Sequence, residues 1–231
     1  MKHNITRALV FVLTVVVGAV QAMAAVNSKD IVVDFPSDLP EIAQRHTEAM
    51  YVYDTGHNEV VLYLEQDHGQ KLSILDVTDP AKISALGEVS INAPSAFDFV
   101  QGLRGGSSVL IHFRNHSGFG VISFRNYKQP RLRLEPNDIH PATVQRDGGS
   151  ALLFVSTSGG AAQPPDVQYE VVNVVSASDQ KPLATIQGVK QRLDMPESGS
   201  IYLLSDSGLY VIRRLERERS YEQNLYDPPE S

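Results

Sequence analysis

Polar and charged side chains occur together at four separate places in the sequence, each where the chain leads into a short apolar stretch, and two of these places contain a histidine. These residues are His46 and Glu48, Asn92 and Asp98, Asp138 and His140, and Gln191, Arg192 and Asp194. Imidazoles and carboxylates are the groups that most often transfer protons or bind metal ions in proteins. If the fold brings the four places together, their side chains can bind one ligand. The residues expected to bind it are His46, Asn92, Asp98, His140 and Asp194.

Two interpretations of this set stay open. In the first, the residues are solvated loop side chains, or polar groups that satisfy one another in a narrow channel. In the second, His46, His140 and Asp194 form a polar or metal-binding cluster, although the sequence does not identify the metal. No cofactor other than a metal ion is expected.

Another histidine pair has the spacing of a zinc site on a helix. His112 and His116 are four residues apart, which would place both imidazoles on one helix face. However, His116 and His68 are each flanked by Asn, Asp or Gly, the residues that tight turns require. We therefore expect His68 and His116 in hairpin turns and His112 on a strand, with zinc as a minor alternative.

A strand–turn–strand pattern recurs four times and determines the expected fold. The hairpins cover residues 60–76, 109–124, 151–175 and 200–213, and shorter apolar stretches flank them. Four strands in 40 to 50 residues are typical of a β-propeller blade. The fourth unit lacks a trailing strand, whereas residues 30–35 form a strand without a partner. The sequence thus predicts an all-β, propeller-like fold of about four four-stranded blades, closed by the N-terminal strand.

One unit resembles a known repeat class. Residues 71–89 carry Asp76, Asp79, Pro80 and Gly87 at the positions that mark the LVIVD repeat of bacterial and archaeal surface or exported proteins. The resemblance implies that the units are propeller blades. Because such propellers generally have more than four blades, three arrangements stay open: a four-bladed ring, an incomplete ring, and a ring completed by a second chain in a homodimer.

The N-terminal residues predict export. Residues 1–24 combine Lys2 and Arg7, an apolar run over residues 8–20 and a small-residue cleavage site at Ala22-Met23-Ala24. The run is shorter than the roughly 20 residues that span a bilayer, so no stable membrane anchor is expected. We expect a periplasmic or secreted bacterial protein. Its single domain covers residues 25–223, and residues 224–231 form a disordered tail after a charged run that is a solvated strand end or a short helix.

The net charge and the absence of known catalytic motifs reduce the number of expected function classes. The net charge of −7 repels phosphate backbones, so nucleic acid is not an expected partner. The sequence contains no Gly-x-Ser-x-Gly, His-Glu-x-x-His or Gly-x-Gly-x-x-Gly motif. We therefore expect a non-catalytic scaffold that binds a protein or a small ligand. The alternative is a periplasmic enzyme of the hydrolase or lyase type that uses the His, Asp and Glu side chains, with or without a metal.

Overall fold

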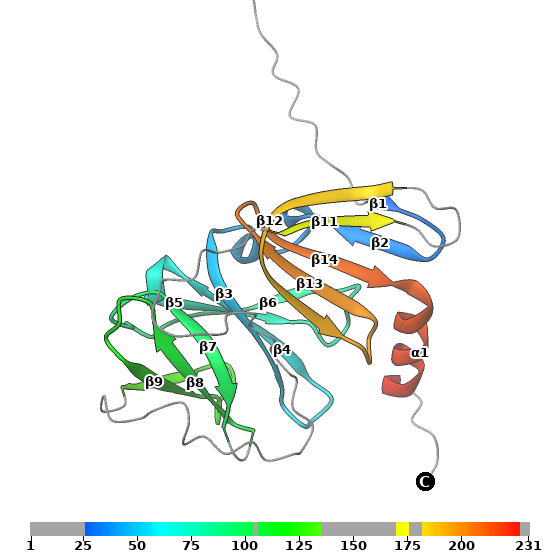
Figure 1. Cartoon of the computed structure of the whole chain (residues 1–231). Helices are drawn as coiled ribbons and strands as arrows, with labels where there is room; N and C mark the ends of the chain where they lie inside the picture. Colours follow the sequence, from blue (N-terminus) through cyan, green and yellow to red (C-terminus); the bar gives the residue numbers. More distant parts are fainter. Residues whose placement is uncertain (1–25, 104–105, 135–169, 176–181, 227–231) are drawn as a thin grey trace, which may run out of the picture.

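The structure, a computed structural model, describes residues 26–103, 106–134, 170–175 and 182–226. The described chain is all-β and forms three antiparallel sheets, followed by a helix (Figure 1). The expected signal peptide lies outside the described residues. Within them, no helix has the length and apolar character needed to cross a membrane.

The first two predicted units each form a four-stranded sheet in chain order. The first sheet consists of β3 (Thr47–Asp54), β4 (Val60–Gln66), β5 (Lys71–Asp76) and β6 (Ser84–Ser90). The second consists of β7 (Phe97–Gly102), β8 (Ser108–Phe113), β9 (Phe119–Ser123) and β10 (Arg131–Leu134). Between β4 and β5 lies a short 3-10 turn, η3 (Asp67–Gly69), in which Asp67 and His68 have positive φ. His116 also has positive φ, in the β8–β9 turn, so the expected turn positions of His68 and His116 are confirmed.

The third sheet joins parts of the chain that are far apart in sequence. Its strand order is β1 (Val26–Asn27), β2 (Ile31–Asp34), β14 (Gly208–Arg214), β13 (Ser200–Ser205), β12 (Pro182–Met195) and β11 (Glu170–Val175). Two further 3-10 turns, η1 (Pro36–Asp38) and η2 (Glu41–Ala43), connect β2 to β3.

Strand β12 corrects the prediction of separate third and fourth units. Its first half pairs with β11 and its second half with β13, so the trailing strand of one unit continues into the leading strand of the next. The only glycine of β12, Gly188, has a φ of 66°, and the register shifts between Val189 and Gln191. A bulge therefore lies in β12 where it passes from the third predicted unit to the fourth. The rest of the third unit, including residues 142–145, 151–155 and His140, lies outside the described residues.

The N-terminal strand pairs with the last unit, as the sequence predicts. In the antiparallel β2–β14 pair, Val33 lies opposite Ile212 and is fully buried. The Arg213 guanidinium donates to Asp34 Oδ2 and to Glu218 Oε1, both at 2.8 Å. These two bonds connect β14 to the N-terminal strand and to the C-terminal helix.

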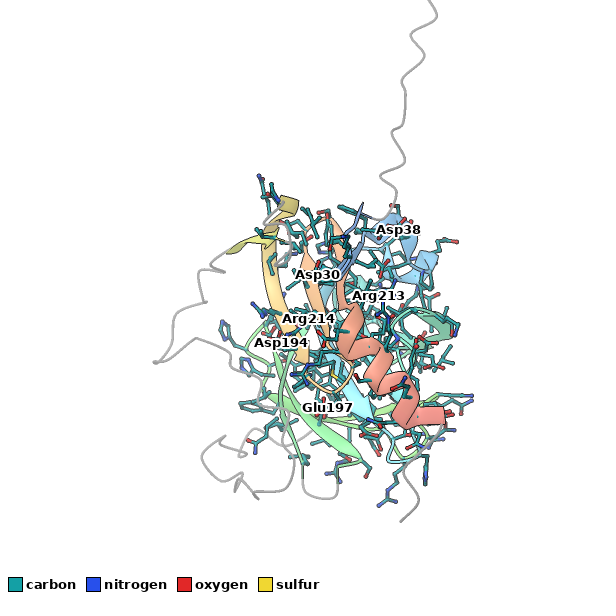
Figure 2. All side chains as sticks on the ribbon, turned by 90° about the vertical axis from the view of Figure 1, so that its right-hand side faces the viewer. Asp30, Asp38, Asp194, Glu197, Arg213 and Arg214 are labelled. Atoms are coloured by element: carbon teal, nitrogen blue, oxygen red, sulfur yellow. The ribbon has the colours of Figure 1, made fainter. Side chains whose placement is uncertain are left out.

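The charged C-terminal run forms helix α1 (Leu215–Tyr226), so the short-helix alternative is confirmed. The prediction of a disordered tail from residue 224 is wrong for residues 224–226, which are helical; residues 227–231 are outside the described chain. The buried or partly buried positions recur every three or four residues and are Leu215, Glu218, Tyr221, Glu222 and Leu225. This spacing gives the helix one face that packs inward, although the charged composition of the segment does not suggest it. Figure 2 shows Arg213 near the start of the helix.

The first sheet is covered on both faces, which makes it the centre of the structure. Along β3, Met50 and Val52 pack with the third sheet, whereas Tyr51 packs with the second. All seven residues of β4 are buried, and Leu62 and Leu64 alternate in the same way with Val61 and Tyr63. Since successive side chains of a strand point to opposite faces, the apolar run of residues 60–64 fits a sheet between two others. Figure 1 shows the second sheet (green) and the third (yellow to orange) on either side of the first.

The β2–β14 pair gives the first testable prediction. Deleting residues 29–36 removes the buried strand and exposes the edge of β14, so we expect the melting temperature to fall by about 10 °C or more. Differential scanning calorimetry measures the change. Deleting only residues 26–27, which form the outer strand β1, is the control and should shift the melting temperature far less. An unchanged melting temperature after the longer deletion contradicts the structural role of β2.

Candidate functional site

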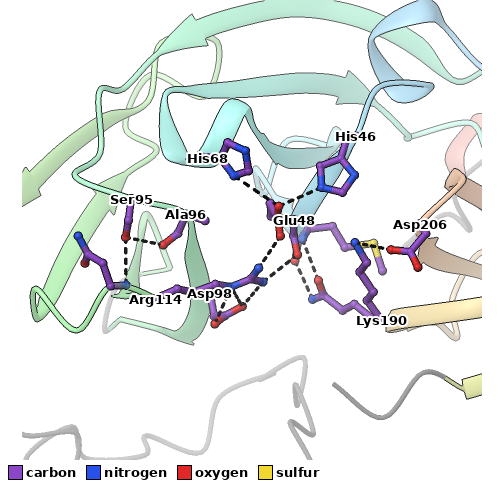
Figure 3. Close-up of polar contacts among 12 residues, drawn as sticks. His46, Glu48, His68, Ser95, Ala96, Asp98, Arg114, Lys190 and Asp206 are labelled. Carbon is purple, nitrogen blue, oxygen red and sulfur yellow. Dashed lines mark hydrogen bonds and ion pairs between the residues drawn. The ribbon is translucent and has the colours of Figure 1, made fainter. Parts of the chain in front are cut away.

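Charged side chains from the first and second sheets meet around Glu48, next to the third sheet (Figure 3). We call Glu48, His46, His68, Asp98 and Arg114 the Glu48 cluster. Glu48 lies on β3 and Asp98 on β7, the leading strands of the first two sheets, and Arg114 directly follows β8. The fold therefore collects residues that are up to 68 positions apart, from His46 to Arg114.

Glu48 is the shared partner of the cluster. Its Oε1 lies 2.9 Å from His46 Nε2 and 3.6 Å from His68 Nδ1, and its Oε2 accepts a hydrogen bond from Arg114 Nη1 at 2.5 Å. The register of β3 against β4 shifts between Thr47 and Ala49, so a bulge at Glu48 sets the direction of its side chain. Only 14% of this side chain is exposed, against 55% for His46 and 81% for His68. The carboxylate is thus held in place beneath two accessible imidazoles.

Arg114 joins the first two sheets. Its Nη2 donates to Asp98 Oδ1 at 2.7 Å and to the Glu48 carbonyl oxygen at 3.0 Å, and its Nε donates to the Asp98 carboxylate at 3.2 and 3.3 Å. A guanidinium that forms paired bonds with a carboxylate fixes orientation as well as distance. Asp98, with 51% of its side chain exposed, consequently has a defined position at the surface.

The third sheet reaches the same region through Gln191 on β12. The Gln191 side-chain amide accepts from the Met50 N–H at 2.8 Å and donates to the Met50 carbonyl at 2.9 Å. It therefore takes the place of a neighbouring strand at the free edge of β3. Beside it, Lys190 pairs with Asp206 at 2.8 Å. Figure 3 shows this pair on the side of Glu48 opposite to Asp98.

Within the described chain, no member of the Glu48 cluster belongs to a group of side chains placed to hold a metal ion. Within residues 26–103, 106–134, 170–175 and 182–226, no three His, Asp or Glu side chains are arranged to hold a metal ion. The His112 ring packs against Phe119, with 4.9 Å between ring centroids, and His116 belongs to a turn.

A second carboxyl group, Glu65, is buried next to the cluster. It lies opposite Ala49 in the β3–β4 pair, has no exposed surface, and neither carboxyl oxygen has a hydrogen-bond partner within the described chain. Burial raises the pKa of Glu65 to about 8, and the nearby negative charge of Glu48 adds to this effect. The positive charge of Arg114 opposes the shift only in part. Glu65 thus holds its proton near neutral pH.

Glu48, in contrast to Glu65, is held in its ionised state. Burial alone raises the pKa of Glu48, but the hydrogen bond with His46 and the charge and hydrogen bonds of Arg114 outweigh burial and lower it below the ordinary value of 4.5. An ionised carboxylate and a protonated carboxylic acid therefore lie close together. Environments that separate two carboxyl groups in this way are typical of functional sites.

The structure brings together two of the five residues predicted to bind a ligand. His46 and Asp98 belong to the Glu48 cluster. Asn92 is exposed and has a φ of 49°, and its N–H donates to the Gln70 carbonyl, so it serves a turn. Asp194 lies on the third sheet (Figure 2). It forms a paired ion bridge with Arg192 at 2.9 and 3.0 Å. His140 is outside the described residues.

The sequence alone indicates the buried carboxyl of Glu65 but not the role of Arg114. Glu65 interrupts an otherwise apolar strand, Val60-Val-Leu-Tyr-Leu-Glu-Gln66, and an acid in such a run is a signal that a buried carboxyl is present. Arg114 has no such signal, because its partners lie in other strands and no fixed spacing connects them.

No family model, curated protein or solved structure matches the chain. The resemblance to the LVIVD repeat therefore stays a prediction based on residues 71–89.

The protonation of Glu65 gives the second prediction. Between pH 4.5 and about 8 the folded protein keeps a proton that the unfolded chain has released, so this group makes the fold less stable as pH rises. Glu65→Gln removes the ionisation, and its stability advantage over the wild type should grow by about 3 kcal/mol from pH 5 to pH 8, since each such pH unit is worth about 1.4 kcal/mol. Urea unfolding at the two pH values measures this difference.

Glu59→Gln is the matched control, because Glu59 is exposed just before the same strand. Its stability relative to the wild type should be the same at both pH values. If Glu65→Gln also shows no pH-dependent advantage, Glu65 is ionised in the folded protein and the assignment of its proton is wrong.

Proposed function

We propose that the chain is an exported, non-catalytic, propeller-like scaffold that binds a protein or a small ligand at the Glu48 cluster. The observation that carries the proposal is the convergence of charged side chains from two sheets, beside a third, on one fixed carboxylate. Loops and strand ends that meet on a rigid sheet scaffold are common positions for binding residues.

The polar groups of the cluster favour a ligand with hydrogen-bond donors or positive charge. Arg114 is already bonded to Glu48 and Asp98, so its charge is largely neutralised. The accessible groups are the carboxylate of Asp98 and the imidazoles of His46 and His68. Because contacts within the cluster already fix Asp98 and His46, binding would cost little side-chain ordering.

The proposal includes a closed, propeller-like arrangement, in the periplasm or outside the cell, in which the third and fourth predicted units share one sheet. The β2–β14 pair supports closure, because it completes the last unit with the first described part of the chain. The export assignment rests on residues 1–24 of the sequence.

An enzyme is the second candidate, and one observation favours it. Glu65 holds a proton next to the ionised Glu48, which is the arrangement of an acid and a base. However, the Glu65 side chain has no exposed surface and so does not reach a substrate in this conformation. Binding is therefore the function that the geometry supports best.

Thermal-shift measurements with amino acids, polyamines, sugars and dicarboxylates test the proposal. We expect at least one compound class with amino groups to raise the melting temperature by several degrees at saturation. Asp98→Asn and His46→Ala should each weaken that effect, with about a tenfold loss of affinity. Both side chains are about half exposed, so these variants should still fold.

His57→Ala is the matched control, because His57 is an exposed histidine in the turn at the other end of β3. It should retain the affinity of the wild type. A compound that stabilises the wild type and both cluster variants equally would place its site elsewhere and contradict the proposal.

A further inference from the structure

A polar pocket lies at the far end of the second sheet from the Glu48 cluster. Its volume is about 270 Å³, and it is lined by Ser123, Arg125, Asn126, Gln129 and Arg131. These residues come from the end of β9, the following turn and the start of β10. Strand β8 separates the two places, because its first residue pairs with Ser123 whereas its last pairs with Phe97, next to Asp98. The pocket is therefore independent of the Glu48 cluster.

The backbone of the pocket is firmly anchored. Phe124 is buried, its ring stacks on Tyr63 with 4.4 Å between centroids, and its N–H donates to the Ser107 carbonyl. The Tyr63 hydroxyl donates to the Tyr127 carbonyl at 2.7 Å, and the Gln129 N–H closes the turn on Asn126. The first sheet thus holds the loop, and the polar side chains between these anchor points line the pocket.

The charge of this region opposes that of the whole chain. No aspartate or glutamate occurs between Asp98 and Glu135, and this stretch contains six lysines and arginines in a chain of net charge −7. Arg125 and Arg131 form no ion pair with any residue in the described part of the chain. The two guanidinium groups keep their donors available, and Asn126, Gln129 and Ser123 add neutral donors beside them.

We propose that this pocket binds a phosphate group, either as the free ion or as the charged group of a larger molecule. Two guanidinium groups supply planar pairs of N–H donors that match the oxygens of a tetrahedral oxyanion. None of the five lining side chains is a carboxylate that would repel an anion. The anchored backbone fixes where these side chains start, so binding a small ion orders only the side chains and not the loop.

Isothermal titration with inorganic phosphate tests the proposal on the purified protein. We expect saturable binding of one phosphate per chain, weakened about tenfold by Arg125→Gln and by Arg131→Gln, and weakened further as sodium chloride is added. Both arginines are exposed, so the variants should keep the melting temperature of the wild type. Arg219→Gln, at an exposed position of helix α1, is the control and should bind phosphate as the wild type does.

Vesicles distinguish the two sources of the phosphate group. An anionic lipid headgroup is the source if the protein sediments with phosphatidylglycerol vesicles but not with phosphatidylcholine vesicles. Arg125→Gln should then abolish this sedimentation. Binding of inorganic phosphate without vesicle binding would assign the pocket to a soluble phosphate. The proposal is overturned if neither probe binds, or if both arginine variants bind each probe as tightly as the wild type.

Discussion

Strand β3 is the element on which the rest of the structure depends, because it belongs to the first sheet and its side chains contact both other sheets. Its side chains alternate between the third sheet, through Met50 and Val52, and the second sheet, through Tyr51. At its free edge the Met50 backbone bonds with the Gln191 side chain instead of another strand. Since an unpaired buried backbone group is costly, these bonds constrain how closely β12 approaches β3. They also place Lys190 beside the Glu48 cluster.

The two carboxyl groups next to β3 show how packing and charge are connected. Glu65 is buried by the same apolar layers that hold the sheets together, and this burial favours its protonated form. Were Glu65 ionised, its charge would repel Glu48, so the neutral state lets Glu48 keep its ion pair with Arg114. The site is therefore a consequence of how the first and second sheets pack.

The sequence predicted the elements better than their connections. Alternating apolar residues predicted the hairpins, and the partnerless strand at residues 30–35 predicted the β2–β14 pair. The merged strand β12 could not be predicted, because Gly188 fits a bulge as well as a turn. The approach of His46 and Asp98 to one cluster followed from their positions just ahead of, or at the start of, leading strands. The partner that connects them, Arg114, could not be predicted, because its contacts depend on how the sheets pack.

A double-mutant cycle between Glu48 and Arg114 tests most directly whether the first and second sheets meet at this cluster. Unfolding free energies of Glu48→Gln, Arg114→Met and the double variant isolate the coupling between side chains from different sheets. We expect a coupling energy of about 1 kcal/mol, reduced by the partial exposure of Arg114, and a smaller value in high salt. Additive effects of the two substitutions would contradict the arrangement.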